Sequence, residues 1–348
     1  MTTVQRWLDA LPEDLVDSDG SLLLVKAWIS AAAGRRHESE CLLREAESLS
    51  ERGPLPDGTV SLESGVATVR AVFGFDGVQT RVETARRAAE LEGEQSSPRS
   101  GLLRFALGAS LYLSGETAAS KKALEEGLGL TEPGQPLLRT VILSFLSLAA
   151  TDEDRLEEAE MLAREASVLV EQFGLHDVPQ STLASIALGC VLTNRGNLNE
   201  AQKELEDALS RRRRLPGLSP WPTLLGLLAL ASVRLARGDR VGARTVLAEA
   251  GSILEDTTDA GIFPERVESL ERKLRGSRSR NGQLNGELTE REMDVLRLLS
   301  GKLSTREMGL DLYVSVSTVR THIKSIYRKL GVSARKDAVQ EARLRGLV

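Results

Sequence analysis

Cysteine and aromatic residues are scarce in this sequence. Its 348 residues include two cysteines, Cys41 and Cys190, and only 3% aromatic side chains. Two distant cysteines supply neither a disulfide framework nor a metal-ligand cluster, which fits a reducing cytoplasm. Because aromatic side chains are so few, the chain has no obvious stacking platform for a sugar or a flat ring. The class of any bound ligand therefore stays open.

Long hydrophobic runs are missing as well. The first residues contain no charged region followed by an apolar one, and the apolar runs 141–150 and 224–236 are too short or too interrupted to span a bilayer. His37 and His176 have no neighbouring ligands at metal spacing, and no nucleophile with a base and an orienting group is recognisable. We therefore predict no membrane segment, enzyme activity, catalytic residue, cofactor or metal site.

Charge is distributed unevenly along the chain. The net charge is −5, but residues 287–348 contain 12 Lys and Arg against 8 Asp and Glu, and the preceding residues contain 33 against 42. An acidic body with a basic C-terminal segment is typical of proteins in which only that segment contacts nucleic acid. The basic run 211–214 precedes Leu215 and Pro216, so we interpret it as a solvated helix C-terminus rather than a second nucleic-acid patch.

An internal repeat organises residues 1–263. Each copy has a turn residue followed by a small or polar residue five positions on, an apolar residue nine positions on and a small one twelve positions on. Arg81 departs from this pattern, because it stands in the small-residue position of the second copy. No single hairpin can bury its apolar face alone, so we predict six stacked helical hairpins. The turn residues, spaced by 42, 39, 39, 42 and 42 positions, are Gly34, Asp76, Gly115, Asp154, Gly196 and Gly238.

Two capping boxes indicate helix starts in the C-terminal segment, at Thr289–Glu292 and Ser304–Glu307. A longer helix is predicted over residues 315–330. Its opposite faces differ, because one is polar and basic and the other is apolar. A short helix, a turn and a helix of this kind make a helix-turn-helix that can enter a major groove. The apolar stripe consists of Val319, Ile323, Ile326 and Leu330.

Three stretches carry a family resemblance: Leu-Thr-Glu-Arg-Glu at 288–292, Ser-Thr-Val-Arg-Thr-His at 317–322 and Tyr-Arg-Lys-Leu-Gly-Val at 327–332. They resemble the LuxR-type (GerE-type) DNA-binding domain across all four of its helices. The resemblance implies a transcription regulator that binds double-stranded DNA through the third helix. Arg320 stands where the family usually has Lys, which keeps the charge and adds a planar bidentate donor.

The outer face of this third helix carries the predicted DNA contacts. Arg320, Thr321 and Lys324 are the candidates for contact with base edges, because they lie near the start of the helix. Thr318 and Arg328 are better placed for phosphates. The full predicted DNA-binding set is Ser317, Thr318, Arg320, Thr321, His322, Lys324 and Arg328.

Two further expectations concern His322 and the last helix. His322 either donates to a phosphate or fills the helix interface, and the sequence leaves both alternatives open. The resemblance implies that the last helix, 335–345, pairs with its symmetry mate through Ala338, Val339 and Ala342. Such a homodimer requires an inverted-repeat operator. A contact with RNA polymerase belongs to the same expectation.

The opening residues 7–16, followed by Ala27-Trp28 and Gly34-Arg35, resemble the helical-repeat region of MalT-like regulators. Those proteins carry an ATP-binding module before the repeats and a LuxR-type domain after them. No GxxxxGK[ST] motif occurs in this sequence. The chain is therefore either the C-terminal part of a larger ATP-switched regulator or a natural short relative. A third alternative is a repeat scaffold whose tail only docks protein.

These observations predict an all-α protein. A TPR-like helical repeat domain over residues 1–274 forms a superhelix, a flexible linker follows over 275–286, and a four-helix LuxR-type domain occupies 287–348. The predicted protein is a cytoplasmic, sequence-specific regulator whose body senses a small molecule or a protein partner.

Overall fold

The computed structural model describes residues 2–49, 53–74, 77–93, 99–214, 218–257, 259–282, 288, 290–301, 303–312, 314, 316–330, 332, 334–344 and 347. Within these ranges every regular element is a helix and no strand occurs, which confirms the all-α prediction. None of the helices found there combines the length and the apolar character that a bilayer crossing requires. The chain divides into two compact units, residues 1–271 and 272–348.

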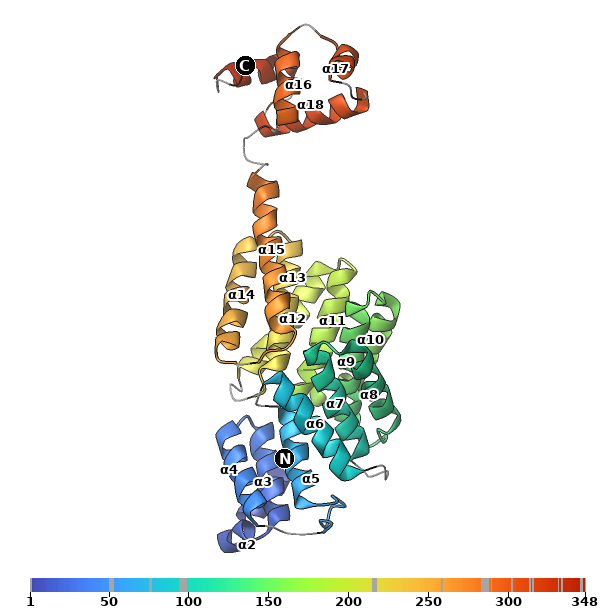
Figure 1. Cartoon of the computed structure of the whole chain (residues 1–348), viewed down its shortest axis with the longest axis vertical. Helices are drawn as coiled ribbons and strands as arrows, with labels where there is room; N and C mark the ends of the chain where they lie inside the picture. Colours follow the sequence, from blue (N-terminus) through green and yellow to red (C-terminus); the bar gives the residue numbers. More distant parts are fainter. Residues whose placement is uncertain are drawn as a thin grey trace. The chain divides into compact units, whose positions relative to one another are not determined.

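Helical hairpins build the first unit, as the repeat predicts (Figure 1). Helices α1 (Thr2–Asp9) and α2 (Glu13–Asp17) precede them, and the short 3-10 helices η1 (Leu175–Asp177) and η2 (Pro179–Ser181) connect the fourth hairpin to the fifth. The first helix of each hairpin packs against its partner and against the first helix of the next hairpin. The six hairpins in the described ranges are α3 (Gly20–Ala32) with α4 (Arg36–Ser48), α5 (Leu62–Phe73) with α6 (Val78–Glu92), α7 (Ser100–Ser114) with α8 (Thr117–Gly129), α9 (Pro136–Asp152) with α10 (Leu156–Gln172), α11 (Thr182–Asn194) with α12 (Leu198–Arg213), and α13 (Trp221–Ala236) with α14 (Arg240–Glu255).

The predicted turn residues adopt the left-handed backbone conformation between the two helices of a hairpin. The four glycines, Gly34, Gly115, Gly196 and Gly238, have φ angles from 78° to 90°, a region that glycine enters without steric cost. Asp154 occupies the same region with φ 58°, and no other non-glycine residue does so in the described part of the chain. The sixth predicted turn residue, Asp76, lies outside the described residues.

Small residues let the two helices of a hairpin approach closely. In the first hairpin Ser39 Oγ donates to the carbonyl oxygen of Ala27 at 2.9 Å, and in the third Ser120 Oγ donates to that of Gly108 at 2.7 Å. The exception, Arg81, is buried as well, with 6% of its surface exposed. The completely buried small residues at this position of the repeat are Ser39, Ser120, Ala159, Ala201 and Ala243.

The first unit closes on itself, because its last hairpin contacts the second and its end contacts the third. The indole Nε1 of Trp221, in α13, donates to the carbonyl oxygen of Gly74 at 3.1 Å. Beyond α14, the amide of Ile262 donates to the carbonyl oxygen of Leu113 at 2.9 Å. The ring of Trp221 also stacks on Phe263, with centroids 5.7 Å apart. Contacts between distant repeats therefore add to those between neighbours.

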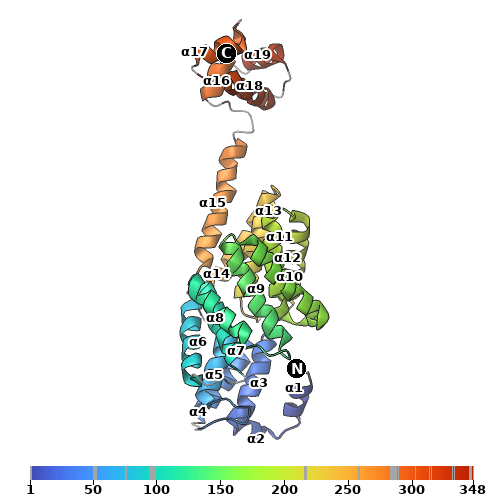
Figure 2. The ribbon, with the colours of Figure 1, turned by 90° about the vertical axis from the view of Figure 1, so that its right-hand side faces the viewer.

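Helix α15 (Phe263–Gly282) corrects the predicted start of the linker. We expected 275–286 to be flexible, but α15 is one continuous helix through Gly282 (Figure 2), and residues 283–286 lie outside the described ranges. The Glu, Arg and Leu residues of α15 favour a helix strongly enough to carry it through Gly276, at a cost of about 1 kcal/mol. The boundary between the two units falls within α15, and the second unit also contains α16 (Glu290–Ser300), α17 (Thr305–Asp311), α18 (Val316–Leu330) and α19 (Arg335–Leu344).

Candidate nucleic-acid interface

Helices α17 and α18 lie against a common core with α16 and α19. Met308 in α17 and Val319 and Ile326 in α18 are completely buried, and Leu330 is 3% exposed. Ile323 packs against the same core as a partly buried side chain. The predicted apolar stripe of α18 is therefore confirmed. A short helix, a turn and a longer helix held by its apolar face form a helix-turn-helix.

A capping box fixes the start of α17. The amide of Ser304 donates to Glu307 Oε2 at 2.7 Å, and the amide of Glu307 donates to Ser304 Oγ at 3.3 Å. The backbone hydrogen bond from Ser304, together with its hydroxyl, lowers the pKa of the Glu307 carboxyl below its usual value. Leu303 and Met308 both join the domain core, as a hydrophobic staple requires. Thr289, the cap of the other predicted box, lies outside the described residues.

The outer face of α18 presents the predicted base-contacting residues to solvent. Arg320, Thr321 and Lys324 are exposed, whereas Val319 beside them is completely buried. One helix therefore separates a basic, hydrogen-bonding face from an apolar one. The remaining predicted residues of α18 are the half-buried Thr318 and His322, and Ser317 and Arg328, whose side chains lie outside the described part of the chain.

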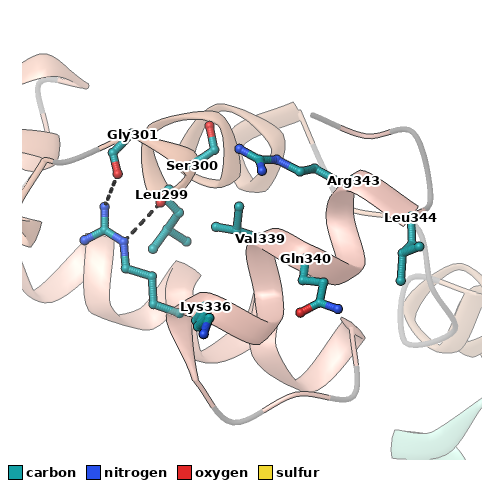
Figure 3. Close-up of a pocket in the computed structure, with 9 residues that line it drawn as sticks. Leu299, Ser300, Gly301, Lys336, Val339, Gln340, Arg343 and Leu344 are labelled. Carbon is teal, nitrogen blue, oxygen red and sulfur yellow. Dashed lines mark hydrogen bonds between the residues drawn. The ribbon is translucent and has the colours of Figure 1, made fainter.

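Arg335, in the first turn of α19, holds the connection between α16 and α17. Its Nε donates to the carbonyl oxygen of Leu299 at 3.0 Å and its Nη2 to that of Gly301 at 3.1 Å, the two bonds dashed in Figure 3. Its Nη1 donates to the carbonyl oxygen of Leu303 at 2.8 Å. The last carbonyls of a helix have no partner within the helix, so the guanidinium supplies donors at the end of α16 and a further one to Leu303, which leads into α17. Sequence reasoning missed this role, because the sequence does not show which carbonyls an Arg will reach.

Two of the three residues predicted for dimerisation are not available at the surface. Ala338 and Ala342 are completely buried and belong to the domain core, which corrects that part of the prediction. They lie four positions apart, so they share the face of α19 that packs against the rest of the domain. Val339 is half-buried and lines a groove with Leu344, which is 76% exposed (Figure 3). The α19 side chains that border this groove beyond Arg335 are Lys336, Val339, Gln340, Arg343 and Leu344.

Two known families match separate segments of the chain, one in the body and one at the C-terminal end. Residues 286–342 match the model of the bacterial regulatory proteins of the luxR family. Residues 66–272, more than half of the chain, match the model of the MalT-like TPR region. The chain belongs to the MalT-like TPR family. Because its MalT-like TPR region precedes a luxR-family domain, the two matches together support a regulator of transcription.

Curated relatives of this MalT-like TPR protein share one segment with it. A Mycobacterium bovis protein named as an HTH-type transcriptional regulator is 44% identical over 87 residues, which are 25% of this chain and 10% of that protein. A Mycobacterium tuberculosis protein of the same description matches with the same identity and coverage. The matched segment thus spans about a tenth of the length of these relatives.

One solved structure shares the all-helical fold of this chain. A Rap protein complexed with Competence and Sporulation Factor aligns over 94% of this chain and 80% of its own, with a TM-score of 0.50 and 13% identity. The Rap conjugation gene regulator of the plasmid pLS20, in complex with the Phr* peptide, aligns over 97% of this chain and 99% of its own, with a TM-score of 0.45 and 13% identity. At such identity the first likeness shows a common all-helical fold.

Proposed function

We propose that this MalT-like TPR protein is a cytoplasmic regulator of transcription that binds a specific DNA sequence through α18 and senses a ligand or a protein through its helical-repeat body. The main support for this proposal is that α18 is amphipathic, with one buried apolar face and one exposed polar face. Val319 and Ile326 are buried in the domain core, while Arg320, Thr321 and Lys324 are exposed. A helix held by its apolar face presents its polar face to a major groove.

The proposed base contacts come from the exposed residues of α18. A guanidinium at Arg320 can bind guanine O6 and N7 together, a pairing that contributes about 1–3 kcal/mol of discrimination. Lys324 lies one turn further along the same face, and Thr321 adds a methyl or hydroxyl contact. Contacts with phosphates fix the orientation without reading sequence. The proposed remainder of the DNA-contact surface consists of Ser317, Thr318, His322 and Arg328.

The proposed dimer on DNA uses the outer side of α19. Leu344 is 76% exposed, Val339 is half-buried and both border the same groove, so these two residues replace Ala338 and Ala342 as candidates for an apolar contact. So small a surface supplies little affinity, and we expect the protein to pair on an inverted-repeat operator rather than in solution. A contact with RNA polymerase stays a prediction of the family resemblance.

A sensing role for the body is supported by its fold. The Rap protein with the similar helical fold is complexed with Competence and Sporulation Factor. A closed superhelix in this chain likewise offers an interior surface, lined by the first helices of its hairpins. We propose that an effector bound to the body changes the affinity of the protein for its operator.

Selection from a random duplex library tests the proposal, with the full chain as bait. We expect enrichment of an inverted repeat whose half-sites lie about one helical turn apart. In fluorescence anisotropy the selected duplex should bind about 1,000-fold or more tightly than a scrambled duplex of equal length. If no sequence is enriched and both duplexes bind alike, the chain is not a sequence-specific regulator.

Two other functions, a fragment of an ATP-switched regulator and a protein-docking scaffold, each predict a result in the same titrations. If the chain is part of a larger ATP-switched regulator, its operator affinity alone will be unresponsive to nucleotide, because the sequence contains no phosphate-binding loop. If the chain is a scaffold, its tail will bind protein and will show no preference among duplexes. The same anisotropy titrations separate the scaffold from the regulator, because only the regulator binds one duplex more tightly than another.

A further inference from the structure

A cavity of about 250 Å³ lies inside the first unit. Residues from the first helix of all six hairpins, α3, α5, α7, α9, α11 and α13, contribute to its wall. Most of the wall is apolar. The low aromatic content led us to expect no stacking platform, but the fold gathers five of the twelve aromatic side chains here. These five are Trp28, Phe73, Phe105, Phe145 and Trp221.

Two arginines line this apolar cavity, Arg81 of α6 and Arg212 of α12. They are 6% and 5% exposed, and burial lowers the pKa of each to about 10, so both stay cationic at neutral pH. Arg81 Nε donates to Ser110 Oγ at 3.0 Å, and Arg212 Nε donates to Thr223 Oγ1 at 2.8 Å. Among the residues the structure describes, no carboxylate lies within 4.0 Å of either guanidinium. A buried charge without an opposite charge is strongly destabilising, which favours binding of an anion.

The two guanidinium groups converge on one contact between hairpins. Arg212 Nη2 donates to the carbonyl oxygen of Ser219 at 2.7 Å, and Ser219 Oγ donates to the carbonyl oxygen of Gly74 at 3.3 Å. Arg81 lies against the same glycine, because a Cβ atom placed on Gly74 would be 2.5 Å from Arg81 Nη1. Both cations therefore border the Gly74–Ser219 contact, where the sixth hairpin meets the second.

We infer that this cavity binds a small carboxylate with an apolar tail, and that Arg81 and Arg212 hold its head group. The inference rests on the proposed sensing role of the body and gives the chemical class of the effector. The head group follows from charge complementarity, because guanidinium groups bind carboxylates through two parallel hydrogen bonds. The tail follows from the aromatic wall, which an apolar ligand removes from water.

The volume of the cavity limits the size of the ligand. An apolar protein cavity of about 150 Å³ holds one benzene molecule. A cavity of about 250 Å³ accordingly holds a ligand of roughly ten non-hydrogen atoms. Octanoate has this size and carries the required head group.

Octanoate is therefore the first probe, and its binding to the full chain is measured by isothermal titration calorimetry. Octan-1-ol and octylammonium keep the tail and change the head group, while hexanoate and decanoate vary the length. We expect one octanoate per chain with a Kd below about 1 mM. Octan-1-ol should bind about tenfold more weakly, and octylammonium should not bind. Quenching by 8-bromooctanoate reports the location, because Trp28 and Trp221 line the cavity.

Arg81→Met and Arg212→Met test the head-group site. Methionine keeps the apolar part of each side chain but removes hydrogen bonds, such as the one to the carbonyl oxygen of Ser219, so circular dichroism checks that both variants fold. Each should lower the affinity for octanoate by about 10-fold to 100-fold and leave that for octan-1-ol unchanged. Arg213→Met is the matched control, because Arg213 is 53% exposed and pairs at 2.7 Å with Glu249.

Three results would overturn the inference. The first is that no straight-chain carboxylate of six to ten carbons binds. The second is that octan-1-ol binds as tightly as octanoate. The third is that both methionine variants keep full affinity for octanoate. None of these measurements contains DNA, so the proposed regulator function is tested separately. A chain that binds octanoate but shows no sequence-selective DNA binding contradicts that function alone.

Discussion

Trp221 and Gly74 are 147 positions apart in the sequence, yet the indole Nε1 of Trp221 donates to the carbonyl oxygen of Gly74 at 3.1 Å. Ser219 gives the same carbonyl a second hydrogen bond at 3.3 Å. Hairpins that contact only their neighbours would make no such bond. The contact joins the sixth hairpin to the second and forms the part of the cavity that Arg81 and Arg212 border.

Replacing Trp221 tests this closure. Trp221→Phe removes a buried hydrogen bond and leaves part of the ring volume empty, so we expect a loss of about 2 kcal/mol of stability. Hydrogen exchange of the amides in α5 and α13 measures it, because both helices should open together. Trp7→Phe is the control, since Trp7 is 68% exposed and its change should stay within about 0.5 kcal/mol. Equal exchange in both variants would show that closure does not stabilise the body.

Arg335→Met tests the guanidinium that bridges α16 and α17. The substitution leaves three carbonyl oxygens, those of Leu299, Gly301 and Leu303, without their donors. We expect the second unit to lose about 2 kcal/mol of stability, seen as faster exchange in α16 and α17. Arg343→Met, an exposed position on the same helix, should change exchange little. A similar loss in both variants would contradict the role assigned to Arg335.

The capping box predicts a dependence on pH. Hydrogen bonds from Ser304 lower the folded-state pKa of Glu307, so the carboxylate stabilises α17 above its ordinary pKa of 4.5. That stabilisation is lost as the pH falls through the lowered value. Glu307→Gln should therefore differ from the wild type at neutral pH and converge with it in acid, in the protection of α17 against hydrogen exchange. Asp311→Asn on the same helix serves as control, and a difference independent of pH would count against the capping box.

Local sterics explain how much of the body could be predicted. Four glycines and Asp154 take the left-handed conformation at the predicted turns, because each turn depends only on its own few residues. The closure through Trp221 and Gly74 could not be predicted in the same way. It depends on the small rotation between successive hairpins, which accumulates over the whole array. The end of α15 at Gly282 was also missed, because a glycine weakens a helix without ending it.

In the DNA-binding domain and in the cavity, the spacing of apolar residues predicted which side chains are buried, whereas residue type alone did not. The spacing of Val319 and Ile326 predicted which face of α18 is buried. Ala338 and Ala342 were assigned to a partner, but a small apolar residue suits a domain core as well as a dimer contact. Arg212 was interpreted as solvated because it stands in a basic run, although it is 5% exposed. In the sequence, only Arg81 pointed to the cavity of the first unit, because its side chain breaks the small-residue pattern of the repeat.

Arg328→Ala should weaken binding to all duplexes alike. We predict that Arg328 contacts a phosphate, so its loss releases about one counterion fewer and lowers the slope of log affinity against log salt by about 0.9. Anisotropy titrations with the operator and with a scrambled duplex measure both quantities. A change in the ratio of the two affinities would show that Arg328 reads a base instead.

The most direct test of the central claim is the affinity of Arg320→Ala for the selected operator and for a scrambled duplex, measured over a salt series. Arg297→Ala, which removes a charge from a 65% exposed position on α16, is the matched control. We predict that Arg320→Ala reduces the discrimination between the two duplexes by about 1–3 kcal/mol, while Arg297→Ala preserves it. If Arg320→Ala weakens both duplexes by the same factor, Arg320 contacts a phosphate and α18 does not read sequence through this face.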